Sequence, residues 1–213
     1  VDNLGQPTRL CEIVRPTIGI ITNIGPDHLE FFGTMDVSAQ AKAEMLDLLP
    51  SDGVAILNAD DSYYDYLAAR ARCRVVSFGF SSKAEVRAMD LKSDGRNGTI
   101  FRLLLPGTVR HAAVHIRVQG DHNVTNALAA GAVGSILGLS GGVIAQGLSR
   151  FRPAAMRSQV RVSQGVKLII DCYNANPASM KAAVQLLAQT GAQRKRIAVL
   201  GDMLELGPNA AQM

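Results

Sequence analysis

An acid, an aromatic ring and two carboxamides follow the apolar run Val166–Ile170 within a few residues: Asp171, Tyr173, Asn174 and Asn176. The run has the pattern of a buried strand, and Pro177 is well suited to begin a helix after it. Ligands of open α/β sheets bind beyond the carboxyl ends of the strands, so these side chains are candidates for a ligand site. Tyr173 fits equally well as a core aromatic whose hydroxyl finds a partner.

A second polar cluster follows the apolar run Ile18–Ile21 and includes Asp27 and His28. Histidine beside carboxylates holds a divalent cation or carries a proton, whereas Gly-Pro-Asp is also ordinary turn chemistry. Both interpretations remain open. Lys42 lies on the next predicted helix, and taken alone it is typical of a solvated surface lysine.

Two carboxamides and one arginine complete the candidates. Asn123 and Asn126 lie three residues apart at the start of a predicted helix, where they share a face. Carboxamides on that face read the donor and acceptor edge of a purine, although either one also suits a helix N-cap. Arg157 has the forked donors of a phosphate ligand, with a surface role as the default.

Composition excludes several classes of protein. With 213 residues and 47% hydrophobic content, the chain has enough apolar material for an ordinary core, and it contains no run of 18 apolar residues. The net charge of +4 is spread along the chain and aromatic residues make up 5%, a pattern that does not favour nucleic acid binding. Three widely spaced cysteines suit reduced thiols in a cytoplasmic protein, which we expect to be monomeric.

The elements that position these residues alternate between strand and helix over the first 80 residues. This alternation predicts an α/β fold with a mostly parallel sheet flanked by helices. Period-two patterning over 85–119, with a turn cluster at 94–98, predicts a small antiparallel ribbon beside the main sheet. The ranges predicted as strands are 18–23, 54–58 and 75–78, and those predicted as helices are 37–49, 62–72, 123–137 and 143–148.

A linker at 151–153 predicts two domains, residues 1–150 and residues 151–213. The second domain has predicted strands at 160–162 and 166–170, a helix at 178–190 and another strand at 196–200. We interpret this pattern as a βαβ unit that is too small to close a sheet, and we expect the sequence to be a piece of a longer protein.

Taken together, these motifs resemble the Mur ligases, which form amide bonds with ATP during peptidoglycan precursor synthesis. The resemblance rests on segments that look like the signatures of their central domain and of the branch that adds D-alanyl-D-alanine to UDP-N-acetylmuramoyl-tripeptide: Thr22–Asn23 with Asp27–Leu29, Ala41–Glu44, Asn58–Asp61, His122–Ala130, Asp171–Met180 and Gly201–Gly207. It implies a P-loop-type central ATPase domain followed by part of a Rossmann-like C-terminal domain.

The resemblance also implies roles for individual residues. His28 would bind magnesium, and Lys42 would be the lysine that the family carbamylates. The other residues would contact ATP: Asn123 and Asn126 the adenine, Arg157 the γ-phosphate, Asp171 the ribose, and Tyr173, Asn174 and Asn176 the nucleotide side of the cleft. The implied substrates are the UDP-linked tripeptide and D-alanyl-D-alanine.

The sequence departs from the family in two respects. It contains no Gly-x-x-x-x-Gly-Lys-Ser/Thr phosphate loop, and Asn3 stands where the family carries a magnesium-binding glutamate. We therefore expect the 213-residue chain to be inactive towards ATP by itself. Two alternatives stay open, a folylpolyglutamate synthetase-like amide ligase and a non-catalytic nucleotide-binding scaffold of the same fold.

Overall fold

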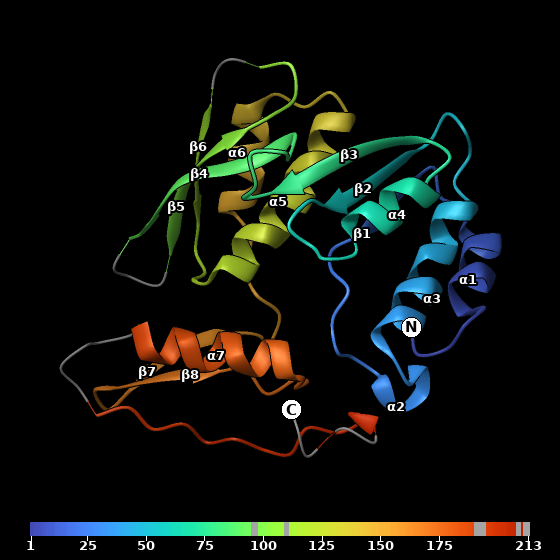
Figure 1. The fold of residues 1–213 in the computed structure, drawn as a ribbon. Helices are drawn as coiled ribbons and strands as arrows, with labels where there is room; N and C mark the ends of the chain where they lie inside the picture. The colour runs from blue at the N-terminus through green and yellow to red at the C-terminus, as the bar shows by residue number, and fades with distance from the viewer. Residues whose placement is uncertain (95–97, 109–110, 190–194, 208–209, 211–213) are drawn as a thin grey trace.

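The computed structural model describes residues 1–94, 98–108, 111–189, 195–207 and 210. Its main feature is one six-stranded sheet in the order β1-β2-β3-β4-β5-β6 (Figure 1). The strands are β1 (Ile18–Ile21), β2 (Val54–Asn58), β3 (Arg74–Gly79), β4 (Val86–Ser93), β5 (Thr99–Leu104) and β6 (Ala112–Ile116). The first four strands are parallel, and β5 and β6 continue the sheet in antiparallel order. The predicted mostly parallel α/β sheet is confirmed.

The predicted antiparallel ribbon is confirmed as β4 to β6, but it is joined to the edge of β3 and continues the main sheet, where a position beside that sheet was predicted. β4 joins the edge of β3 through the pairs Phe78↔Val86 and Gly79↔Arg87. This pairing occupies backbone groups that an exposed edge of β3 would leave unpaired, which is the physical reason for one continuous sheet. Of the turn cluster predicted at 94–98, residues 95–97 lie outside the described part of the chain.

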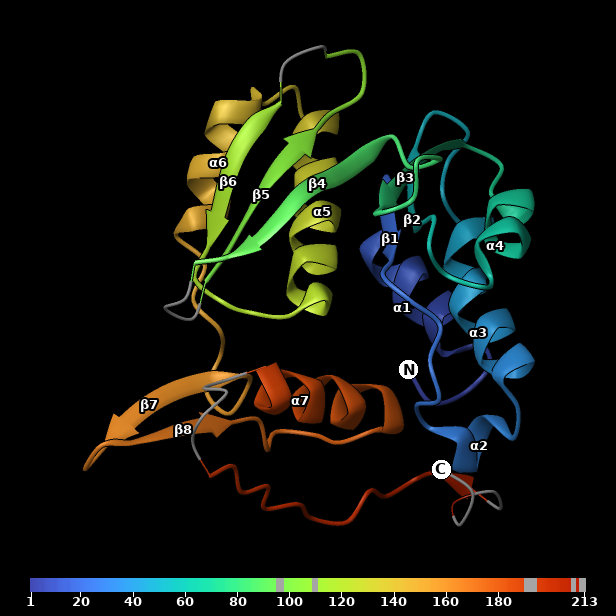
Figure 2. The same cartoon turned by 60° about the vertical axis from the view of Figure 1, so that its left-hand side comes forward.

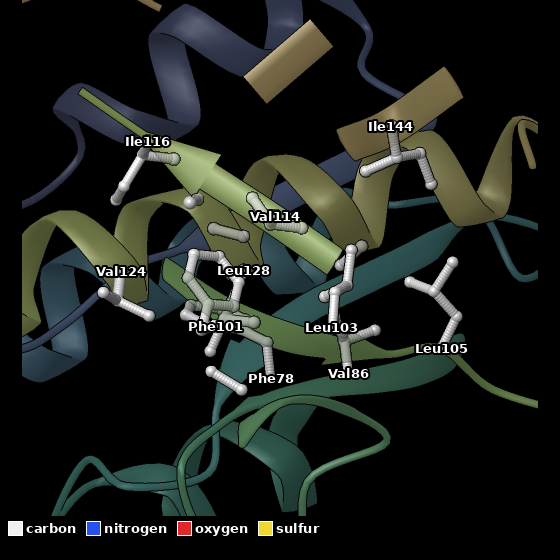
Figure 3. Packing of buried hydrophobic residues seen from close by; sticks show 14 of the residues in the cluster. Phe78, Val86, Phe101, Leu103, Leu105, Val114, Ile116, Val124, Leu128 and Ile144 are labelled. Atoms are coloured by element: carbon white, nitrogen blue, oxygen red, sulfur yellow. The ribbon is translucent and has the colours of Figure 1, made fainter. Parts of the chain in front are cut away.

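Helices cover both faces of the sheet and create two cores. α5 (Asp121–Ile136) and α6 (Gly141–Ser149) pack on one face, where alternate residues of β5 such as Phe101 and Leu103 meet Leu128 (Figure 3). α3 (Met35–Asp47) and α4 (Tyr64–Arg70) cover the opposite face of β1 to β3. Each buried leucine or phenylalanine side chain contributes about 1.5 to 3 kcal/mol, so both faces stabilise the strand ends that carry the polar loops.

Two helices were not predicted, α1 (Gln6–Val14) and the single turn α2 (Leu29–Phe32). α1 packs against α3, and the Glu44 carboxylate of α3 accepts hydrogen bonds from Gly5 N at 2.7 Å and from Thr8 Oγ1 at 2.8 Å. A carboxylate at a helix N-terminus satisfies free N–H groups and opposes the positive end of the helix dipole. Glu44 is therefore an anchor for α1.

An ion pair joins α3 to α4 and provides a test of how these two helices are held together. Arg70 donates through Nε and Nη2 to the Asp47 carboxylate, which lowers the pKa of Asp47 below its ordinary 3.8. A depressed aspartate pKa stabilises the folded state above the ordinary value, and this contribution is lost as the pH falls through the lowered one. Arg70→Ala should therefore cost at most about 1 kcal/mol near neutral pH, since the pair is partly exposed.

Urea unfolding of wild type and Arg70→Ala at neutral and acidic pH measures this cost. The difference in free energy of unfolding should shrink once the pH falls below 3.8. A difference that stays constant with pH would mean that Arg70 acts through packing of its side chain alone. Asp47→Asn combined with Arg70→Ala is the control that removes the pH-dependent part.

The remainder of the chain forms a β-hairpin and a helix. β7 (Gln159–Ser163) and β8 (Val166–Ile170) are antiparallel, and Gln164 and Gly165 both have positive φ in the two-residue turn between them. α7 (Pro177–Gln189) follows and lies along the hairpin (Figure 2). The end of the predicted helix, Thr190, lies outside the described residues.

The predicted strand at 196–200 is wrong. These residues have no regular structure, and Ile197 and Val199 are 68% and 93% exposed. In the part of the chain that the structure describes, β8 pairs with β7 alone, so the predicted βαβ unit is absent. An apolar run becomes a strand only when another strand and a covering layer are present, and here neither is formed around it.

Within the described ranges, no helix combines the length and apolar character needed to cross a membrane.

Candidate functional site

The loop after β1 is held in place by polar groups at the end of β2. Asp61 Oδ2 accepts a hydrogen bond from Ile24 N at 2.7 Å, and Asn58 Nδ2 donates to Thr22 O at 3.0 Å. Asp60 accepts from Ser81 N at 2.9 Å and so ties the loop after β3 to the same edge. These short polar residues follow a buried strand, and their bonds to the backbone fix the loops at the carboxyl edge of the sheet.

Lys42 of α3 lies near this edge, because the charges of Asp27 and Asp61 act on it. It is half-buried, and its Nζ donates to Ser38 Oγ at 3.0 Å, one turn earlier on the helix. Burial lowers the pKa of Lys42, while the nearby Asp27 and Asp61 carboxylates act in the opposite direction. The default interpretation of Lys42 as a solvated surface residue is therefore wrong.

His28 lies between two carboxylates. Its Nε2 is 3.6 Å from Asp27 Oδ2, and its Nδ1 is 2.5 Å from Glu205 Oε2. His28 has a left-handed backbone with φ of 57°, as the residue just before α2. The turn and functional interpretations of this loop are thus compatible, because the turn is what directs the imidazole to its partners.

This arrangement fits part of a cation site. Asp27 and His28 Nε2 are neighbouring donors, and Lys42 lies close enough for the Asp27 charge to act on its pKa. The described residues contain no group of three or more histidine, cysteine, aspartate or glutamate side chains able to hold a metal ion. Mg²⁺ is commonly held by one or two carboxylates together with water and substrate phosphates, so a short protein donor set suits this ion.

A second cluster lies at the start of α5, beside an apolar pocket of about 610 Å³ between α5 and α6. Asn123 and Asn126 line the pocket with Ala130, Ile144 and Phe151. The N-cap of α5 is Gly120, so the capping interpretation is wrong for both asparagines. Asn123 Nδ2 donates to Gln119 O at 2.7 Å, and this bond holds the carboxamide at the N-terminal end of α5.

The residues after the linker form a third cluster. The Arg157 guanidinium lies over the Tyr173 ring, 4.1 Å from its centroid. Asp171 Oδ1 accepts from Ser158 N at 3.1 Å, and its charge acts on His122 of α5. Tyr173 is 65% exposed, so its interpretation as a core aromatic is wrong. The cation–π contact and the Asp171 bond hold Arg157 and its loop against the end of β8.

Asn174 and Asn176 use their carboxamides locally. Asn174 Oδ1 accepts from Ala175 N at 2.9 Å. Asn176 Oδ1 accepts from Ser179 N at 2.8 Å, and Ser179 Oγ accepts from Asn176 N at 3.0 Å, which is reciprocal capping at the start of α7. Both side chains therefore shape the turn between β8 and α7.

Comparison with known protein families decides what these clusters belong to. Residues 1–134 match the Mur ligase middle domain, and residues 156–213 match the Mur ligase glutamate ligase domain. The chain belongs to the Mur ligase family. The predicted resemblance to that family is thereby confirmed.

Individual Mur ligases are similar along nearly the whole chain. The UDP-N-acetylmuramoyl-tripeptide–D-alanyl-D-alanine ligase of Mycobacterium tuberculosis H37Rv is 40% identical over 97% of this chain and 41% of its own length. The UDP-N-acetylmuramate–L-alanine ligase of Xanthomonas oryzae pv. oryzae PXO99A is 38% identical over 87% of this chain and 40% of its own. MurF from Acinetobacter baumannii superposes with a TM-score of 0.90 at 32% identity, covering all of this chain and 46% of that one.

This Mur ligase chain spans about two fifths of the length of the curated relatives it matches. The sequence did not single out two residues of this site, Asp61 and Glu205. Asp61 lies in a polar group at the end of a predicted strand, which was the signal available. Glu205 lies 177 residues from its partner His28, and no local pattern reports a contact of that separation.

Proposed function

We propose that this chain is the central and C-terminal part of an ATP-dependent ligase that adds D-alanyl-D-alanine to UDP-N-acetylmuramoyl-tripeptide. The observation that carries the proposal is the 40% identity, over both parts of the chain, to a ligase of that name. The domain boundary that we propose, between residues 1–150 and 151–213, places the pocket beside α5 in the first domain except for Phe151, and the Arg157 cluster in the second.

In the proposed reaction, the tripeptide carboxylate attacks the γ-phosphate of ATP, which yields an acyl phosphate and ADP. The amine of D-alanyl-D-alanine then attacks the acyl carbon and releases phosphate. The first step brings two anions together, so fixed positive charge is needed to offset their repulsion. Magnesium, held by His28 and carbamylated Lys42, would supply positive charge at the phosphates.

The residues of the chain suit the remaining tasks. Asn123 and Asn126 present carboxamides at an apolar pocket, which suits the flat face and polar edge of adenine. Arg157 offers forked donors to the γ-phosphate, and its stacking on Tyr173 restricts the guanidinium before ATP arrives. Asp171 would accept from the ribose hydroxyls, while Tyr173, Asn174 and Asn176 would border the nucleotide. Lowering of the Lys42 pKa favours the neutral amine, the form that reacts with carbon dioxide.

The proposed acceptor is tested by ADP release from the full-length protein. We expect release to require the UDP-linked tripeptide and D-alanyl-D-alanine together, and to be slow when L-alanine or glutamate replaces the dipeptide. The identity to the L-alanine ligase favours a second candidate, which requires L-alanine and UDP-N-acetylmuramate instead. ADP release with L-alanine and UDP-N-acetylmuramate alone would contradict our proposal. ADP release with glutamate and a folate would identify the folylpolyglutamate synthetase-like alternative. We expect the 213-residue chain alone to release no ADP. We also propose that the full-length protein is a monomer in the cytoplasm.

A further inference from the structure

Residues 195–207, which follow α7, run along the lower edge of both ribbon views and reach α2 (Figures 1 and 2). Glu30 N donates to Glu205 O at 3.0 Å, so the attachment includes the backbone. Leu206 is buried, and a Cβ at Gly207 would be 3.0 Å from Leu29 O. The chain from Glu205 to Gly207 is therefore docked on α2, although the residues before it lack regular structure.

This docking gives Glu205 a side-chain partner as well. Glu205 has φ of 60° and His28 has φ of 57°, so each occupies a left-handed backbone position that most residues avoid. The resulting distance from Glu205 Oε2 to His28 Nδ1 is 2.5 Å, within hydrogen-bond range. Asp27 Oδ2 is 3.6 Å from Nε2, which is too long for a hydrogen bond.

The two distances indicate which nitrogen of the His28 ring carries the proton. An ionised carboxylate has no proton to give, so the bond to Glu205 requires the proton to be on Nδ1. A neutral ring then has its lone pair on Nε2, on the side of Asp27. Histidines that bind cations commonly donate their other N–H to a carboxylate or carbonyl, which fixes both the tautomer and the direction of the ring.

We propose that Glu205 is a positioning residue for His28: it holds the imidazole as the Nδ1–H tautomer with Nε2 free to bind. The role of His28 as a ligand rests on the function proposed above, whereas its orientation by Glu205 does not. The docked segment from 205 to 207 thus couples the C-terminal part of the chain to the loop after β1. We expect His28 to be held as this tautomer only while that segment is seated on α2.

Ring ¹⁵N NMR of the 213-residue chain, at a pH where its histidines are neutral, tests the orientation directly. In the wild type, His28 should show a protonated Nδ1 and an unprotonated Nε2. Glu205→Met has similar length and no acceptor, and it should shift His28 towards the Nε2–H tautomer. Glu205→Gln retains an acceptor oxygen and should restore the wild-type pattern. Glu12→Met, on the exposed face of α1, is the matched control.

Unchanged His28 ring signals in Glu205→Met would overturn the proposal. Hydrogen exchange of the Glu30 amide, which is bonded to Glu205 O, reports whether the segment remains docked. A Glu205→Gln variant with a protected Glu30 amide but the Met-type ring pattern would also overturn it. In the full-length enzyme, Glu205→Met should lower kcat with little change in KM for ATP, and Glu205→Gln should recover part of the loss. Altered ring signals with unchanged kcat would contradict the function proposed for His28 and leave its positioning intact.

Discussion

Replacing Lys42 with glutamine should lower the turnover of the full-length ligase by about 100-fold or more, the cost typical of removing one electrostatic stabiliser from an active site. Lys42 is half-buried beside Asp27 and Asp61, and burial lowers its pKa. An anionic carbamate at this position would contribute to holding a cation, and a neutral carboxamide cannot replace its charge.

Lys42→Arg separates the two possible roles of the side chain. Arginine retains the positive charge and is not carbamylated, so we expect a loss similar to that of Lys42→Gln. Full activity of Lys42→Arg would show that the cation is what matters and would contradict carbamylation. A carbamate signal in ¹³C NMR under ¹³CO₂ should appear in the wild type and be absent from both variants. Lys92→Gln, an exposed lysine on β4, should have wild-type turnover.

Arg157→Ala should lower turnover of the full-length enzyme by a factor of about 100 to 1,000, with a much smaller change in KM for ATP. Arg157 is held over the Tyr173 ring, so its guanidinium is oriented before the substrate binds. An interaction that strengthens as charge develops on the transferred phosphoryl group affects kcat more than binding.

Arg157→Lys retains the charge and loses the planar fork, so it should recover only part of the rate. Arg161→Ala, four residues along on exposed β7, is the matched control and should leave kcat unchanged. Steady-state kinetics at saturating tripeptide and dipeptide measures both constants. Equal turnover of Arg157→Ala and Arg161→Ala would remove Arg157 from the mechanism.

Most of the fold was predictable because its signals are local. The strand at 54–58 was predicted with its observed bounds, and α3 and α5 were each predicted within two residues of theirs. The two errors of topology both concern pairing. The ribbon at 85–119 joined β3, and the apolar run at 196–200 found no strand to pair with. A strand's identity depends on its neighbours, which lie far away in the sequence.

For the candidate site too, local signals could be predicted from the sequence and contacts between distant segments could not. The sequence identified which residue types are present at strand ends, and motif similarity proposed their roles. It did not reveal that Asn176 caps α7, that Tyr173 stacks against Arg157, or that Lys42 is half-buried. Each of these facts depends on what surrounds the side chain.

By itself, the sequence determined the α/β class, most of the helices and strands, and the Mur ligase resemblance, because apolar periodicity and short motifs are encoded within a few consecutive residues. Only the tertiary structure decided that Glu205 meets His28 across 177 residues and that Asp61 holds the loop after β1. These contacts arise when packing of the sheet and helices brings distant segments together. The geometry of these contacts depends on the complete packed structure, so no short segment of the sequence specifies it.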